Sequence, residues 1–155
     1  MFVFKLQKAL DNRIESEDEA KRNFLMKKNE LDQEKQRLEE IELLILETLE
    51  KYKKLKEGTL NLISLKNYEN YLKKIKLERT HQEFVVKNCH EALEELKELF
   101  IEARKERKIL EKLKEKKKEV YDEELIKEEQ KFMEEISNSM YNNRRNADGK
   151  RKKET

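Results

Sequence analysis

Residues 68–110 read YENYLKKIKLERTHQEFVVKNCHEALEELKELFIEARKERKIL, and the spacing of their apolar side chains decides the fold. Alternating steps of four and three residues select a mostly apolar series: Tyr68, Leu72, Ile75, Arg79, Gln82, Val86, Cys89, Leu93, Leu96, Phe100, Ala103, Arg107 and Leu110. A series with one member per about 3.5 residues forms a narrow stripe on a helix that supercoils against a partner helix. The stretch is therefore predicted to be one half of a coiled coil.

The other half lies upstream, where one seven-residue register contains a second, mostly apolar series: Leu10, Glu17, Phe24, Leu31, Leu38, Ile45 and Tyr52. Between the two series lies Gly58, and glycine allows a chain to leave a helix and turn back. A turn centred on residue 60 would place Ile45 opposite Ile75 and Leu31 opposite Cys89, so a single register satisfies both series. We therefore expect an antiparallel hairpin.

The predicted fold class is all-α, a long antiparallel two-helix coiled-coil hairpin with an overhanging C-terminal helix. Helix one is expected over about 5–57, the turn over about 58–64 and helix two over about 65–140, so that the hairpin domain spans residues 1–141. Ser64 or Thr59 is expected to cap the second helix. Residues 142–155 have almost no apolar side chains and are expected to form a disordered basic tail.

The composition argues against an enzyme. The chain has 155 residues, no proline and 46% charged residues, which suits long helices with one continuous seam in place of a compact interior. Small-molecule catalysis usually needs an enclosed pocket, so we expect no small-molecule substrate, no cofactor and no catalytic residue. His81, Cys89 and His90 diverge on a helix and do not form a metal site.

Two other partner classes are also disfavoured. The basic residues between 104 and 118 are interleaved with glutamates and lack stacking aromatic residues, which favours an acidic protein surface over nucleic acid. The richest apolar run, at 41–46, is far shorter than the ~20 residues of a spanning helix, so no membrane insertion is expected.

Four motifs add a resemblance to this physical picture. They are Phe4-x-Leu6-Gln7-x-x-Leu10-x-x-Arg13 followed by Glu17-Asp18-Glu19-Ala20, then Asn67-Tyr68-Glu69-Asn70-Tyr71-Leu72, Leu110-Glu111-Lys112-Leu113, and Glu129-Gln130-Lys131-Phe132-Met133-Glu134-Glu135. In this order they resemble the flagellar export protein family FliJ, over residues 2 to about 137.

The resemblance implies a non-enzymatic cytoplasmic component of the bacterial flagellar type III export apparatus, peripheral at the inner face of the cell membrane at the flagellar base. Proteins of this family resemble the central stalk of rotary ATPases. The expected partners are the ring of the export ATPase FliI, the export gate protein FlhA and export chaperones.

The resemblance also implies two binding surfaces. The gate patch would comprise Arg37, Ile41, Leu44, Thr48, Tyr71, Ile75, Glu78 and Gln82. This chain departs from the family pattern at Thr48, where an aromatic residue is expected, and at Glu78, where a small one is. Ile75 is equally well interpreted as a seam residue. The ATPase-binding set would comprise Leu6, Gln7, Leu10, Arg13, Leu110, Leu113, Lys117 and Tyr121.

Two alternatives stay open at this point. The first is a generic cytoplasmic coiled-coil scaffold or tether, which would have the same seam. The second is the equivalent stalk protein of a virulence type III secretion system, which physical reasoning alone does not distinguish from the flagellar protein. A prefoldin-like chaperone is disfavoured, because residues 60–64 are too short to supply strands between the helices.

Overall fold

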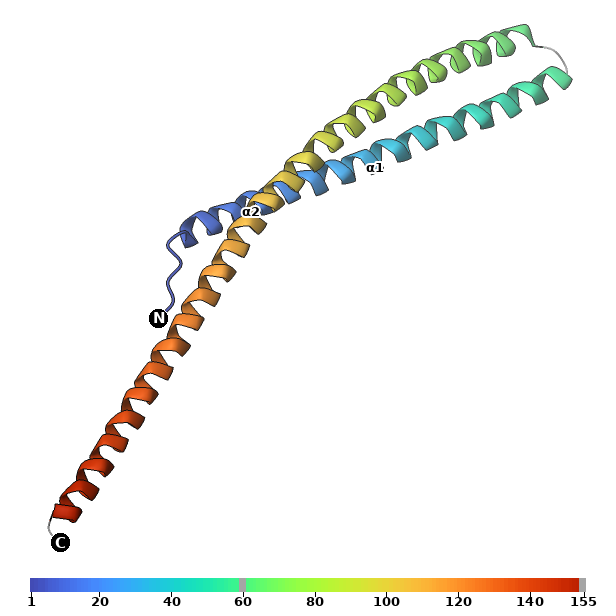
Figure 1. The fold of residues 1–155 in the computed structure, drawn as a ribbon. Helices are drawn as coiled ribbons and strands as arrows, with labels where there is room; N and C mark the ends of the chain where they lie inside the picture. The colour runs from blue at the N-terminus through green and yellow to red at the C-terminus, as the bar shows by residue number, and fades with distance from the viewer. Residues whose placement is uncertain (59–60, 154–155) are drawn as a thin grey trace. The chain divides into compact units, whose positions relative to one another are not determined.

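The computed structural model describes residues 1–58 and 61–153, and within these ranges the regular structure consists of two helices. Helix α1 spans Gln7–Glu57 and helix α2 spans Leu62–Lys153. Figure 1 shows α1 lying beside the first part of α2 and running in the opposite direction. The predicted all-α hairpin is confirmed.

The chain divides into two units. One contains Asn12–Glu106 and is called here the hairpin unit; the other combines Met1–Asp11 with the chain from Arg107 onward and is called the terminal unit. Neither helix has, within the described residues, a segment long and apolar enough to cross a membrane.

The core of the hairpin unit consists of two clusters along the predicted seam. Ile45, Leu72 and Ile75 form the first, and Leu31, Cys89 and Leu93 form the second. Ile45 with Ile75 and Leu31 with Cys89 are pairs that a turn centred on residue 60 predicts. The register read from the spacing is therefore the register of the structure.

Aromatic contacts adjust this register locally. A turn centred on residue 60 places Phe24 opposite Leu96, but the Phe24 ring stacks on that of Phe100, one helical turn further along, with centroids 6.1 Å apart. Aromatic side chains reach further from the helix axis than leucine and favour offset stacking at such distances. Phe24 still packs against the second core cluster.

The turn differs from the prediction in its cap. Asn61 Oδ1 accepts hydrogen bonds from the backbone N–H groups of Ile63 and Ser64 at 3.1 and 3.4 Å. These are the contacts of an N-cap residue, so Asn61 begins α2, and Ser64 lies inside the helix. Thr59, the other predicted cap, lies outside the described residues.

The end of α2 also differs from the prediction. Helix continues to Lys153, whereas a helix end near residue 140 and a disordered tail from residue 142 were expected. Residues 142–153 contain no proline, and Gly149 costs a helix only about 1 kcal/mol relative to alanine. Low hydrophobicity did not predict this end, because residues 142–153 extend a helix that begins at Leu62 and so need no nucleation of their own.

Candidate functional site

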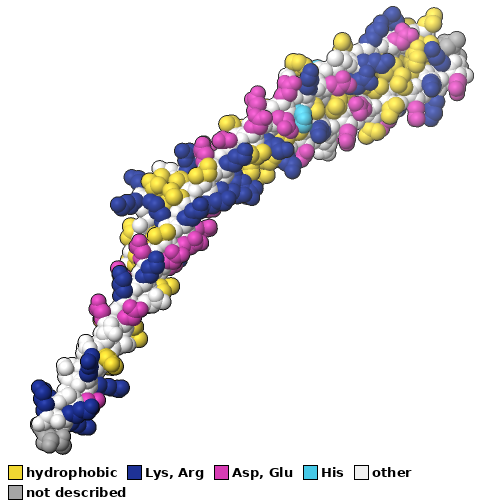
Figure 2. Space-filling model, in the orientation of Figure 1, with side chains coloured by type: hydrophobic (Ala, Val, Ile, Leu, Met, Phe, Trp, Pro, Cys, Tyr) yellow, Lys and Arg dark blue, Asp and Glu magenta, His cyan; other side chains and the backbone are white. Residues whose placement is uncertain are grey.

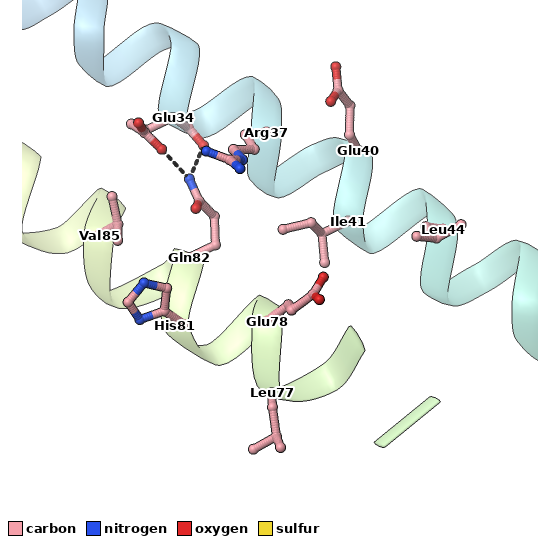
Figure 3. Close-up of a pocket in the computed structure, with 10 residues that line it drawn as sticks. All are labelled: Glu34, Arg37, Glu40, Ile41, Leu44, Leu77, Glu78, His81, Gln82 and Val85. Atoms are coloured by element: carbon pink, nitrogen blue, oxygen red, sulfur yellow. Dashed lines mark hydrogen bonds between the residues drawn. The ribbon is translucent and has the colours of Figure 1, made fainter. Parts of the chain in front are cut away.

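A groove runs between α1 and α2 in the hairpin unit and is called here the central groove. Its volume is about 840 Å³. Figure 3 shows the side chains that line it, which come from both helices: Glu34, Arg37, Glu40, Ile41, Leu44, Leu77, Glu78, His81, Gln82 and Val85. The groove exists because the rounded surfaces of two helices that touch along a narrow seam curve away from each other beside that seam.

A polar contact between the helices forms one wall of this groove. Gln82 is 5% exposed, and its Nε2 donates hydrogen bonds to the backbone carbonyl of Glu34 at 3.0 Å and to the Glu34 carboxylate. Gln82 occupies a seam position where a coiled coil usually has an apolar residue. A buried amide at such a position fixes the axial register of the two helices at some cost in stability.

Replacing Gln82 with leucine should stabilise the hairpin. The Glu34 side chain is only partly buried and can hydrogen-bond with water after the change, so little is lost when its partner is removed. We expect the free energy of unfolding, measured by urea denaturation, to rise by about 1 kcal/mol. Gln33→Leu, on the exposed face of α1, is the control and should change little. A lower stability of Gln82→Leu would contradict this interpretation.

Five of the eight gate-patch residues line the central groove: Arg37, Ile41, Leu44, Glu78 and Gln82. Leu44 and Tyr71 present 37% and 42% of their surface to solvent, which leaves them accessible to a partner.

Besides Gln82, two gate-patch residues are buried. Ile75 is 2% exposed, which supports its interpretation as a seam residue. Thr48 is 4% exposed, and its hydroxyl donates to the Leu44 carbonyl at 2.7 Å, so it contacts its own helix. Ile75 and Thr48 therefore pack inside the hairpin, beneath the exposed residues of the gate patch, and are not accessible to a partner.

The sequence interpretation missed several residues of the central groove. Glu34, Glu40 and His81 line it beside the predicted residues, together with Leu77 and Val85. Three glutamates against one arginine make the lining acidic. The heptad pattern could have identified these positions, since they flank the seam, but it does not say where along the seam the groove widens.

The ATPase-binding set lies mostly in the terminal unit. There Leu10 is 3% exposed, and Gln7 accepts a hydrogen bond from Lys114 Nζ at 2.7 Å. Leu110 and Leu113 are half-buried, whereas Leu6 and Lys117 are exposed. One member, Arg13, belongs to the hairpin unit, where it forms an ion pair with Glu106.

A second, shallow groove in the terminal unit surrounds the aromatic start of the chain. The rings of Phe2 and Tyr121 are tilted with centroids 5.6 Å apart. Lys116, Lys117, Val120 and Glu124 line the same groove. Of these groove residues, Lys117 and Tyr121 were predicted as contact residues, whereas the contact of Tyr121 with Phe2 was not predicted.

No group of three or more potential metal ligands is present among the described residues. Cys89 is buried in the second core cluster. Burial raises the pKa of the Cys89 thiol, nearby Glu30 and Glu34 act in the same direction, and Lys27 acts against them. The thiol is therefore a seam side chain that stays protonated, and it is a poor nucleophile.

This pKa shift predicts an alkaline loss of stability. The pKa of the thiol is higher in the folded protein than in the unfolded chain. The thiol therefore contributes stability at pH values below the unfolded pKa, and this contribution is lost as the pH rises through the folded pKa. In urea unfolding from neutral pH to about pH 10, the wild-type protein should lose more stability than Cys89→Ala. If the free energies of unfolding of the two proteins fall in parallel as the pH rises, the Cys89 thiol does not contribute to the pH dependence.

The family described as "Flagellar FliJ protein" matches residues 1–146. No curated protein and no solved structure matches the chain. The family match covers nearly all of both units and both candidate surfaces, and it confirms the resemblance drawn from the four motifs. The chain therefore belongs to the FliJ family, whose members are non-enzymatic components of the flagellar protein export apparatus.

Proposed function

We propose that this protein links the export ATPase to the export gate in the manner of a rotary-ATPase central stalk. In this proposal the terminal unit binds the FliI ring, and the central groove of the hairpin unit binds FlhA and export chaperones. The protein acts in the cytoplasm, at the inner face of the membrane at the flagellar base. Family membership favours this function over a generic scaffold and over a virulence-system stalk.

The observation that carries the proposal is the position of the gate patch. The family resemblance implied eight residues without reference to any cavity, and five of them line one groove between the two helices. Such a groove offers a partner both apolar side chains, Ile41 and Leu44, and charged ones, Arg37 and Glu78. A mixed lining suits a reversible contact, because apolar groups contribute affinity and charged groups contribute specificity.

Binding to the ATPase ring is supported by the exposed residues of the terminal unit. Leu6 is 41% exposed and offers an apolar contact, and Lys117 offers a positive charge beside the Phe2–Tyr121 pair. Contacts between exposed charges are individually weak and are screened by salt. The association should therefore weaken as the ionic strength rises.

The test is to mix the purified protein with FliI at near-physiological salt and to measure hexamer assembly and ATP hydrolysis. We expect both to increase, and we expect Leu6→Ala/Lys117→Ala to reduce the increase severalfold. Leu46→Ala, at a 60% exposed position in the hairpin unit, is the control and should act like the wild type. If the wild-type protein changes neither quantity, the proposed ATPase contact is wrong.

A further inference from the structure

The last part of α2 separates its charges along the helix. Residues 122–135 contain seven acidic and two basic side chains, a net charge of −5, whereas residues 136–153 contain six basic side chains and Asp148, a net charge of +5. All of these residues are exposed. Figure 2 shows Lys and Arg side chains at the C-terminal end of the chain, as well as along the rest of it.

Apolar side chains lead directly into the basic segment. Ile136, Met140 and Tyr141 are 37%, 61% and 64% exposed. Residues four apart lie on the same side of a helix, so Ile136, Met140 and Arg144 form one row, and Tyr141 and Arg145 form the next. One side of α2 therefore presents apolar groups followed by two guanidinium groups.

The helix dipole does not account for this arrangement. Positive side chains stabilise the last turn of a helix, and Lys150, Arg151, Lys152 and Lys153 occupy the last turn of α2. Arg144 and Arg145 lie outside that turn, and the effect of the dipole falls off within it. Nor does the dipole explain why Ile136 and Met140 lie exposed on the same row.

We propose that residues 136–153 of α2 bind the surface of an anionic lipid bilayer. Ile136, Met140 and Tyr141 would enter the boundary between headgroups and acyl chains, and Arg144 and Arg145 would pair with lipid phosphates. Helices that lie on membranes combine these features, an apolar side and basic residues beside it, and tyrosine is enriched at that depth. Guanidinium groups bind phosphate through paired hydrogen bonds. Residues 136–153 contain one carboxylate, Asp148, against seven in residues 122–135, which limits the contact to this segment.

A lipid surface fits this segment better than nucleic acid does. Nucleic acid would use the arginines but would leave Ile136 and Met140 exposed, because single-strand binding depends on stacking aromatic groups. This contact is independent of the proposed ATPase and gate surfaces, which lie elsewhere in the chain.

The experiment is cosedimentation of the full-length protein with vesicles. We expect binding to mixed phosphatidylcholine–phosphatidylglycerol vesicles, weaker binding at high salt, and little binding to phosphatidylcholine alone. Arg144→Gln/Arg145→Gln should lower the partition coefficient by about tenfold to thirtyfold, since each basic residue contributes about one factor of five at an anionic surface. Ile136→Gln/Met140→Gln should lower it by at least about tenfold.

Matched controls make the test specific. Lys127→Gln/Lys131→Gln removes the same charge from the acidic part of α2, and Ile126→Gln removes an exposed apolar group there; both should bind like the wild type. Circular dichroism checks that every variant remains helical. The proposal is overturned if the two vesicle types bind equally, if the Lys127/Lys131 and Arg144/Arg145 variants lose binding equally, or if the protein binds single-stranded RNA but not the anionic vesicles.

Discussion

Replacing Ile75 with alanine should lower the free energy of unfolding of the hairpin by about 2–5 kcal/mol. Ile75 is 2% exposed and packs with Ile45 and Leu72 in the first core cluster. Alanine would remove most of the buried side chain and leave a cavity in the seam between the two helices. Since a small domain is stabilised by only about 5–15 kcal/mol in total, this one change should remove a large part of its stability.

The loss of stability can be measured by urea denaturation, with the helix content followed by circular dichroism at 222 nm. The matched control is Leu77→Ala, two residues away on α2, where the side chain is 72% exposed. A surface substitution of this kind should change the stability by less than about 0.5 kcal/mol. Equal losses in the two variants would show that Ile75 is not part of a packed seam.

The seam could be predicted because its cause is local and periodic. A spacing of about 3.5 residues determines which side of each helix is apolar, and the position of Gly58 determines where the chain turns. Together they place Ile45 with Ile75 and Leu31 with Cys89, as the core clusters confirm. No long-range information beyond the two patterns was needed.

The features that were not predicted depend on the atomic detail of particular side chains. Asn61 begins α2 because its amide oxygen reaches two backbone N–H groups, whereas Ser64 was an equally reasonable cap by residue type. Gln82 was correctly placed in the seam, but its bonds to Glu34 follow from side-chain conformation. The width of the central groove depends on how far the helices diverge, which a heptad pattern does not encode.

The second large effect concerns the gate contact. Tyr71→Ala and Leu44→Ala should each weaken binding of FlhA by about tenfold or more, because a small number of partly exposed anchors usually supply most of the energy of an interface. Tyr71 is 42% exposed and Leu44 is 37% exposed, so both retain free surface while their remaining atoms are held by the hairpin. The affinity of each purified variant for the cytoplasmic part of FlhA can be measured by isothermal titration calorimetry.

Each variant has a control of the same chemistry. Phe84→Ala removes an aromatic ring that is 60% exposed, and Leu46→Ala removes a leucine that is 60% exposed; neither residue belongs to the gate patch. Both controls should bind FlhA with the wild-type affinity if the contact is confined to the patch. Loss of helicity in Tyr71→Ala or Leu44→Ala would show that the residue stabilises the hairpin, and its effect on binding would then be indirect. Equal weakening by all four variants, with helicity kept, would indicate that the partner contacts the exposed apolar side chains of the hairpin generally, and that the central groove has no special role.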